Sequence, residues 1–355
     1  MHLLKSFLNF YLSHYSCIMD IEKKALIIGA GAIGGITAAF LSRNGFPVVL
    51  VTKHPDLAEQ ISNEGIHITG VQGEFTQKIP AVASLHDLSE KFSLVLIATK
   101  ATDMAQAAKD VLPLLTDKSR VVSLQNGICE DKLGEIAGLD RVIGCVVGWG
   151  ATMHKPGYLE MTSTGEFVIG LPDGRMTSEI DVLAEMLNVI VPVIKTANIY
   201  GHLYSKLIIN SCITTLGAVT GLTLGRLLSK RKARDVFIEV MRESMAVAEA
   251  LNIKVEPYAG KLDYYRFFKN SGFSRRIYRH LLILFMGIKY RKVKSSSLQS
   301  LERGKPTEID FLNGYISAKG KEYGIPTPVN DILISMVRQI EQKKRKIRAE
   351  NLDKI

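Results

Sequence analysis

Cysteine is scarce in this chain, with four residues in 355. They stand at positions 17, 129, 145 and 212, and no pair has the spacing of a metal site or of a C-x-x-C redox motif. Zinc and thiol–disulfide chemistry are therefore not expected, and no metal site is predicted. So few cysteines fit a reducing compartment, and we expect a cytoplasmic protein.

The chain also lacks the composition of a disordered or fibrous protein, because 46% of its residues are hydrophobic and 23% are charged. Its length suggests two domains, each with enough apolar residues for a core. Acidic residues are in deficit, with 45 basic against 35 acidic residues and a net charge of +10. This excess weakly favours anionic ligands, but a basic surface and the basic C-terminal stretch EQKKRKIRAE account for it. A nucleic-acid partner is not expected.

Residues 1–18 lack the features of a signal peptide. His14 and Tyr15 interrupt the apolar centre, and no small-residue cleavage site follows. The stretch is also too short and too polar to span a bilayer. The pattern of a folded domain begins just after Met19. We expect residues 1–18 to be an extension, or Met19 to be the true start.

Short apolar runs predict buried strands in the first half of the chain. They lie at Ala25–Ile28, Val48–Val51, Leu94–Ala98, Val121–Leu124 and Val142–Val147. Helical patterns alternate with them at Gly31–Arg43, Asp103–Leu115 and Glu130–Ala137. This alternation predicts a parallel sheet with both faces covered. Short antiparallel strands are expected at Ile66–Thr69 and Glu74–Ile79, and further strands within residues 149–170.

A G-x-G-x-x-G motif follows the first expected strand and opens the first expected helix. It consists of Gly29, Gly31 and Gly34, with Ala32 and Ile33 between the last two glycines. In this context the glycines allow a pyrophosphate to approach the helix N-terminus, where free N–H groups favour anions. The motif predicts a Rossmann-type dinucleotide-binding domain with these five residues at the cofactor. The alternative is a tight strand–helix turn without a ligand.

The residue after the second expected strand bears on the choice of cofactor. NAD sites usually carry Asp or Glu there, but this chain has Lys53 and no acid. Lysine can pair with a 2′-phosphate, so the sequence favours NADPH. A solvated loop lysine is the alternative.

The second half of the chain has a different hydrophobic pattern. From Gly201 onward helical patterns dominate, with helices expected at Tyr200–Leu216, Lys232–Leu251 and Pro306–Tyr323. We therefore expect an α/β domain at residues 19–197, followed by an all-α C-terminal domain at residues 198–355.

Polar residues at strand ends and within apolar helices are candidates for the site. Lys100 and Asn126 follow two expected strands and project toward a cofactor crevice, although Asn-Gly is also a common turn. Lys206 and Asn210 share one face of an otherwise apolar helix, where a lysine is costly unless paired or used as a proton donor. The alternative for Lys206 is a side chain that extends to the surface. Glu308 is either a site residue or part of a first helical turn.

The order of the motifs is similar to that of one known family. G-A-G-A-I-G-G, a strand ending in T-K, Q-N-G, K-L-x-x-N, and S-S-x-L-Q followed by T-E-I-D-x-x-N-G occur in series. Together they resemble the ketopantoate reductases (2-dehydropantoate 2-reductases) over about residues 23–335. The resemblance implies NADPH-dependent reduction of ketopantoate to (R)-pantoate, on the way to pantothenate and coenzyme A. The alternatives are a relative that reduces another 2-keto acid and an NADP-binding protein without turnover.

The resemblance also implies roles for individual residues. The catalytic lysine of the family corresponds to Lys206, as general acid. The residues that correspond to its substrate-binding positions are Asn210, Ser296, Glu308 and Asn126. The residues that correspond to its cofactor and crevice positions, besides the glycine motif, are Lys53, Lys100 and Asn126.

Two features depart from the family pattern. Thr214 and Thr215 stand where many members carry a second asparagine. The segment of residues 259–294 is longer than in compact members and contains a basic amphipathic stretch at 275–294. Its apolar core, Leu281–Ile288, is too short to span a bilayer. Such a helix usually packs against its own domain or a second subunit, which would make a homodimer. The less expected alternative is association with anionic lipid.

Overall fold

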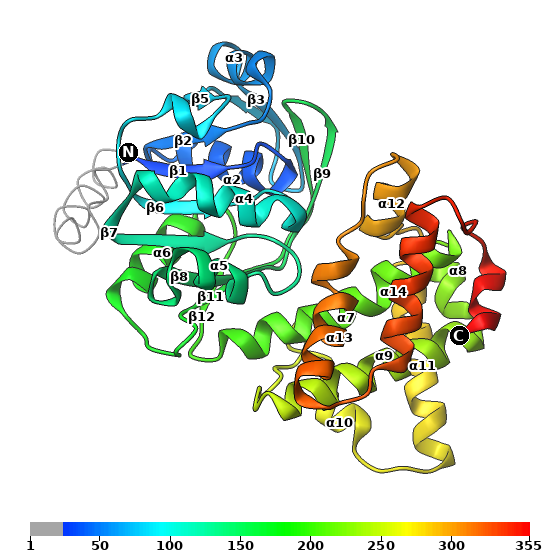
Figure 1. The fold of residues 1–355 in the computed structure, drawn as a ribbon. Coiled ribbons are helices and arrows are strands. Elements are labelled where there is room, and N and C mark those ends of the chain that lie inside the picture. The colour runs from blue at the N-terminus through cyan, green and yellow to red at the C-terminus, as the bar shows by residue number, and fades with distance from the viewer. Residues whose placement is uncertain (1–23) are drawn as a thin grey trace. The chain divides into compact units, whose positions relative to one another are not determined.

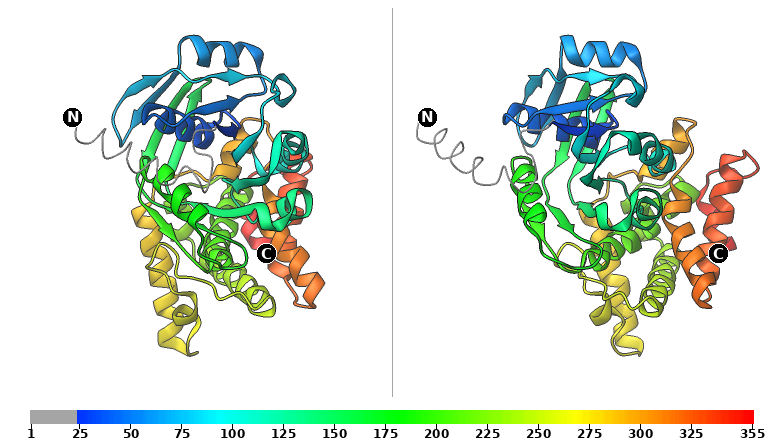
Figure 2. Two further views of the ribbon diagram at one scale, coloured as in Figure 1. Left: turned by 90° about the vertical axis from the view of Figure 1, so that its left-hand side faces the viewer. Right: turned by 60° about the vertical axis from the view of Figure 1, so that its left-hand side comes forward.

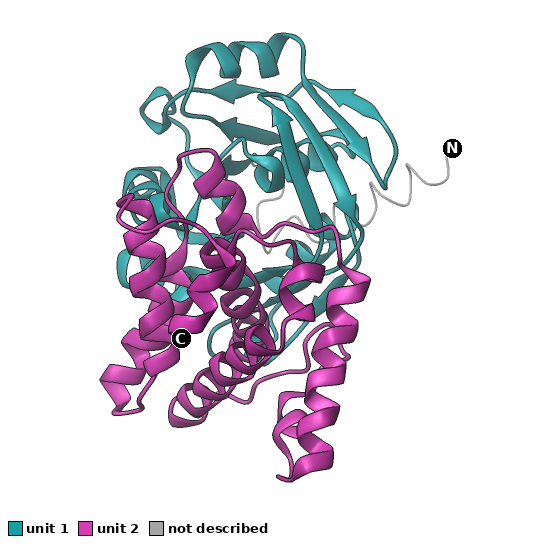
Figure 3. Cartoon of the chain, turned by 90° about the vertical axis from the view of Figure 1, so that its right-hand side faces the viewer, with its two compact units in different colours: residues 1–125, 129–199 teal, residues 126–128, 200–355 magenta. Residues whose placement is uncertain are grey.

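The computed structural model of the protein describes residues 24–355, so the expectations for residues 1–18 and for Met19 lie outside the described residues. The chain divides into two compact units (Figure 3). The first unit ends at Ile199, and the second runs from Tyr200 to Ile355 and also includes residues 126–128. Residues 126–128, which follow Gln125 of the Q-N-G motif, therefore belong with the helical unit.

The first unit is built on an eight-stranded sheet in the order β12-β11-β8-β7-β6-β1-β2-β5. All neighbouring strands are parallel except β8 and β11. The strands are β1 (Ala25–Ile28), β2 (Val48–Val51), β5 (Ala81–Val82), β6 (Phe92–Ile97), β7 (Leu115–Ser123), β8 (Val142–Val147), β11 (Phe167–Gly170) and β12 (Val193–Lys195). The expected ranges of β1, β2 and β8 are confirmed to the residue, because fully buried strands consist of unbroken apolar runs.

Helices cover both faces of this sheet, as expected for parallel strands (Figure 1). They are α2 (Ala32–Arg43), α3 (Pro55–Asn63), α4 (Ala101–Val111), α5 (Glu130–Ala137) and α6 (Ser178–Asn188). Ile27 and Leu50 point into a core shared with α2 and α6, whereas their neighbours Leu26 and Val49 are equally buried on the opposite face. The predicted α/β class of the first half is confirmed.

A second, four-stranded sheet in the order β4-β3-β10-β9 packs near α2. Its strands are β3 (Ile66–Gly70), β4 (Phe75–Gln77), β9 (Gly150–Lys155) and β10 (Tyr158–Ser163). The antiparallel pairing of β3 with β4 confirms the two short antiparallel strands expected in this region. Gly35 permits the packing, because a Cβ there would lie 2.5 Å from Cδ1 of Leu159.

Residues 200–355 form helices joined by loops and contain no strand, apart from one isolated β-bridge. Its helices are α7 (Ile199–Thr220), α8 (Leu224–Ser229), α9 (Arg231–Ala250), α10 (Tyr264–Phe268), α11 (Phe273–Lys289), α12 (Ser296–Glu302), α13 (Asn313–Tyr323) and α14 (Pro328–Glu341). Helices α13 and α14 lie side by side (Figures 1 and 2). Within residues 24–355, no helix combines the length and the apolar character needed to cross a membrane.

Two expected helices differ from the observed structure. The helix expected at Asp103–Leu115 ends at Val111, because Leu112–Leu114 form a 3₁₀ turn that contains Pro113 and β7 begins at Leu115.

Pro306–Tyr323 is not a single helix: a short 3₁₀ turn covers Ile309–Phe311, and α13 begins only at Asn313. Leu312 separates the 3₁₀ turn from α13. Its φ of −110° and ψ of −101° are not a helical conformation. The backbone N–H and hydroxyl of Thr307 both donate to Glu341 on α14, which holds the preceding segment away from a helical path. Helices α3, α6, α8, α10, α12 and α14 were not among the expected elements.

Candidate active site

The loop between β1 and α2 has the geometry of a phosphate-binding turn. Gly29 has φ +115°, and a Cβ there would lie 2.8 Å from the carbonyl carbon of Ala98. A Cβ on Gly34 would lie 2.0 Å from the Gly29 oxygen. Gly31 differs, because no heavy atom of the described residues would lie within 4 Å of its Cβ. Packing therefore demands glycine at 29 and 34, whereas Gly31 leaves open space beside the backbone.

The N-terminus of α2 faces this space without a side-chain cap. Gly31 is the N-cap residue, and the first turn, which includes Ala32 and Ile33, carries no acidic side chain. The first N–H groups of a helix have no partner inside the helix, and the helix dipole favours an anion there. Open space, uncapped donors and the absence of a repelling carboxylate fit the pyrophosphate of a dinucleotide.

The strand ends that surround the loop share one edge of the sheet. Strands β7, β6, β1 and β2 are adjacent and parallel, so their carboxyl ends lie at the same edge. Lys100 follows β6 and is the exposed N-cap residue of α4. Gln125 follows β7, accepts a 2.7 Å hydrogen bond from Ser123, and has its amide nitrogen 3.5 Å from the hydroxyl oxygen of Thr99. In open α/β sheets this edge is where ligands bind.

Lys53, at the end of β2, has a partner that the sequence did not suggest. Its Nζ lies 2.6 Å from Oδ2 of Asp103, in the first turn of α4, and both side chains are exposed. The lysine expected to meet a 2′-phosphate is thus engaged by a carboxylate from the first turn of α4. Asp103 is therefore a further candidate for a role near the ribose.

Within the second unit, α7 presents Lys206 and Asn210 one turn apart on one face. Both side chains are half-buried, in a helix whose other residues are mostly buried and apolar. Nδ2 of Asn210 lies 3.5 Å from Oδ1 of Asn126, in the segment 126–128. The structure thus places Asn126 beside the helix face that carries Lys206.

Gly127 brings the same segment against the chain near Glu308. It has φ +91°, and a Cβ there would lie 2.4 Å from the carbonyl oxygen of Phe311. Glu308 is half-buried and immediately precedes the 3₁₀ turn that ends at Phe311. The expectation that Glu308 lies in the first turn of a long helix was wrong, because α13 begins five residues later.

The segment that contains Ser295 and Ser296 contacts α7 at Thr214, one turn beyond Asn210. Ser295 is buried, caps α12 by accepting from the Leu298 N–H at 3.2 Å, and donates to the carbonyl oxygen of Thr214 at 3.1 Å. Ser296 is exposed. Ser295, which was not among the expected site residues, anchors the segment one turn beyond Asn210, and Ser296 keeps an exposed side chain beside it.

Glu130 is an unexpected buried acid in the first turn of α5. Its side chain is 1% exposed, and Oε2 has no hydrogen-bond partner among the described residues. Burial raises the pKa of this carboxyl to about 8, although hydrogen bonds from nearby backbone groups oppose the rise in part. Among residues 24–355, no cluster of three or more His, Cys, Asp or Glu could hold a metal ion.

Two family models match the chain. The model described as "Ketopantoate reductase PanE/ApbA" matches residues 25–174, and its C-terminal counterpart matches residues 198–341. The 2-dehydropantoate 2-reductase of Aquifex aeolicus is 29% identical over 90% of this chain and 97% of its own length. That of Pyrococcus horikoshii is also 29% identical, with the same coverage.

Solved structures show the same fold. A PanE/ApbA family ketopantoate reductase from Ralstonia eutropha JMP134 superimposes with a TM-score of 0.77 and 32% identity, over 91% of this chain and all of that one. A D-mandelate dehydrogenase crystallised with NADH and anilino(oxo)acetate gives a TM-score of 0.77 at 23% identity, over 90% of this chain and 99% of that one. The latter likeness concerns the fold alone.

Proposed function

Because the chain belongs to the ketopantoate reductase PanE/ApbA family and is an oxidoreductase, we propose that it reduces ketopantoate to (R)-pantoate with NADPH. We place the reaction in the cytoplasm, on the route to pantothenate and coenzyme A. The observation that supports this most is the arrangement in the second unit. There, Asn126 contacts Asn210 one turn from Lys206, and Gly127 contacts the segment of Glu308.

The glycine turn and the edge of the sheet account for cofactor binding. Backbone N–H groups at Ala32 and Ile33 would hold the pyrophosphate, and Lys53 would exchange Asp103 for the 2′-phosphate. Lys100 would add positive potential at the same sheet edge. When bound, NADPH supplies the hydride that the C2 carbonyl of the substrate accepts.

The helix face accounts for proton transfer and orientation. Lys206 would stabilise the negative charge that develops on the carbonyl oxygen and then donate a proton to it. Asn210 and Glu308 would hydrogen-bond the substrate hydroxyl and fix its orientation. Ser296 and Asn126 would hold the carboxylate. This division gives each polar group of ketopantoate a partner from the chain.

A second candidate, reduction of a different 2-keto acid, is favoured by one feature. Thr214 stands one turn after Asn210, and its hydroxyl donates to the Asn210 carbonyl oxygen at 2.7 Å. A hydroxyl used within the helix offers the substrate less than an asparagine amide would. The pocket is therefore expected to tolerate substrates with fewer hydrogen-bonding groups.

The test is NADPH oxidation by the purified protein across 2-keto acids with and without a 4-hydroxyl group. We expect the highest kcat/KM with ketopantoate. A higher value with an unhydroxylated keto acid would replace the first candidate by the second. NADPH binding without turnover of any substrate would contradict both and indicate a non-catalytic NADP-binding protein.

A further inference from the structure

Helix α11 packs against its own unit through one face only. Ile283 is 1% exposed, and a Cβ on Gly287 would lie 2.8 Å from Cβ of Leu228 on α8. Nε2 of His280 lies 3.4 Å from Oδ1 of Asp235 on α9. The basic amphipathic segment is thus a helix anchored on α8 and α9.

The opposite face of α11 is apolar, and no other part of residues 24–355 covers it. Its exposed side chains are Phe273 (80%), Ile277 (43%), Leu281 (58%), Phe285 (71%) and Ile288 (61%). Spacings of three and four residues place them in one stripe along the helix. We call these five residues the apolar stripe of α11. Large side chains this exposed at regular spacing indicate an interaction surface rather than scattered surface hydrophobics.

The segment around the stripe carries almost the whole charge excess of the chain. No Asp or Glu occurs between Asp263 and Glu302, whereas nine Lys and Arg do. The remainder of the chain has 36 basic residues, from 45 minus 9, against 35 acidic ones. The nine cations are Arg266, Lys269, Arg275, Arg276, Arg279, Lys289, Arg291, Lys292 and Lys294.

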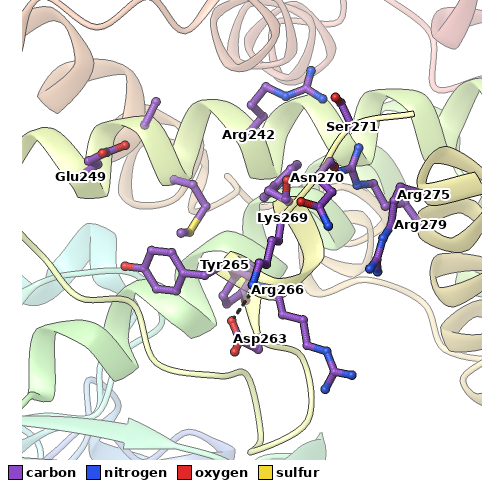
Figure 4. A pocket seen from close by; sticks show the side chains of 14 residues that line it. Arg242, Glu249, Asp263, Tyr265, Arg266, Lys269, Asn270, Ser271, Arg275 and Arg279 are labelled. Atoms are coloured by element: carbon purple, nitrogen blue, oxygen red, sulfur yellow. Dashed lines mark hydrogen bonds between the residues drawn. The ribbon is translucent and has the colours of Figure 1, made fainter. Parts of the chain in front are cut away.

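A cavity of about 1220 Å³ adjoins the N-terminal half of α11 and concentrates some of these cations. Figure 4 shows Arg242 on α9, and Arg275 and Arg279 together on another wall of the cavity. Burial and repulsion by Arg242 and Arg275 lower the pKa of Arg279. Asp263 and Glu249 also line the cavity, but Asp263 is occupied as the cap of α10. The guanidinium of Arg279 already donates to the carbonyl oxygens of Phe267, Phe268 and Asn270, and Arg242 pairs with Glu239. These two cations of the cavity are therefore engaged within the unit, and exposed cations of the segment also lie outside the cavity.

We propose that α11 binds the surface of an anionic phospholipid bilayer, with the apolar stripe in the interfacial layer and the exposed cations Lys289, Arg291 and Lys292 on phosphate headgroups. A helix with an apolar face bearing Phe and Leu, flanked by Lys and Arg, is suited to this environment. A symmetric contact with a second copy is disfavoured, because cations outnumber acids around α11 even when Asp235 and Glu302, which pair with Arg276 and Lys294, are counted. The proposal does not depend on the substrate of the enzyme.

Vesicle co-sedimentation of the full chain tests the proposal. We expect binding to phosphatidylglycerol–phosphatidylcholine vesicles, weak binding to phosphatidylcholine alone, and release at high salt. Leu281→Glu with Phe285→Glu is expected to weaken binding by about tenfold or more, since two apolar side chains lose their burial. Val71→Glu with Met176→Glu is the matched control, because both residues are 52% exposed and lie outside α11. Equal binding by both double variants, or no preference for anionic vesicles, would overturn the proposal.

A tryptophan probe distinguishes insertion from adhesion by charge alone. The natural tryptophan, Trp149, is 5% exposed in the first unit, so Trp149→Phe with Phe285→Trp places the only indole on the stripe. We expect lipids with brominated acyl chains to quench its fluorescence. Absence of quenching in vesicle-bound protein would contradict insertion of the stripe. Sedimentation velocity without lipid tests the other occupant: self-association abolished by Leu281→Glu would assign the stripe to a second copy instead.

Discussion

Nζ of Lys53 lies 2.6 Å from Oδ2 of Asp103, so the cation at the end of β2 and an acid in the first turn of α4 form an ion pair. The two side chains are 68% and 44% exposed, and ion pairs this exposed contribute little to stability. Lys53 can therefore exchange Asp103 for a phosphate at small cost. Lys53 attracts a 2′-phosphate and Asp103 repels it, so replacement of either residue tests the cofactor preference.

We expect the protein to bind NADPH at least about tenfold more tightly than NADH, a difference of about 1.4 kcal/mol. Lys53→Ala should remove most of this preference. Asp103→Asn should widen it, because the 2′-phosphate then faces no carboxylate. Calorimetric titration of both cofactors gives the affinities, and equal affinities in the unmodified protein would contradict the assignment of Lys53.

Replacement of Lys206 tests the proton donor. Lys206→Ala should lower kcat by about 10² to 10⁴, the usual effect of losing a positioned acid, while NADPH binding is retained. Lys232→Ala, which removes an exposed lysine from α9, is the control and should leave kcat unchanged. Near-normal turnover of the Lys206 variant would show that this lysine does not take part in the reaction.

Replacement of Glu308 should act on substrate selection. Losing a charge-assisted hydrogen bond costs about 1.5–3 kcal/mol, so Glu308→Ala should lower kcat/KM for hydroxylated substrates by about ten- to a few-hundredfold. Ketoisovalerate, which lacks the hydroxyl, should be affected much less.

The stability control for this variant is close in the sequence. Because Glu308 precedes a short 3₁₀ turn rather than forming the first turn of α13, its removal should leave the melting temperature nearly unchanged. Asp310→Ala removes a neighbouring acid that pairs with Arg338 at 2.6 Å and should not change substrate preference. A uniform loss on both substrate classes together with a lowered melting temperature would indicate a structural role for Glu308.

Glu130 should make the free energy of unfolding depend on pH. Its pKa is about 8 in the folded protein and 4.5 ordinarily, so the folded state holds an extra proton between these values. This stabilising effect is complete below pH 4.5 and is lost as the pH rises to about 8, by up to about 1.4 kcal/mol per pH unit. Glu130→Gln should remove that slope, as measured by urea unfolding from pH 5 to pH 9. Glu135→Gln, at an exposed position of α5, should retain it, and identical slopes in both variants would contradict a protonated Glu130.

The sequence alone determined the elements whose signal is local. Strands β1, β2 and β8 matched their apolar runs because a fully buried strand needs apolar residues on both faces. The glycine motif and the serial order of Q-N-G, K-L-x-x-N and T-E-I-D indicated the family. Spacing on one helix also placed Lys206 and Asn210 on a common face, since i and i+4 residues are neighbours in any α-helix.

Only the tertiary structure decided the contacts between distant segments. The grouping of residues 126–128 with the helical unit depends on the approach of Gly127 to Phe311, which no local pattern encodes. The pairing of Lys53 with Asp103 joins the end of β2 to the first turn of α4, fifty residues later in the chain. Helix α13 begins at Asn313 rather than near Pro306, because Leu312 has a non-helical conformation and Thr307 is hydrogen-bonded to Glu341 on α14. The exposed face of α11 is decided in the same way, because only the packing of this helix against α8 and α9 determines which side is covered.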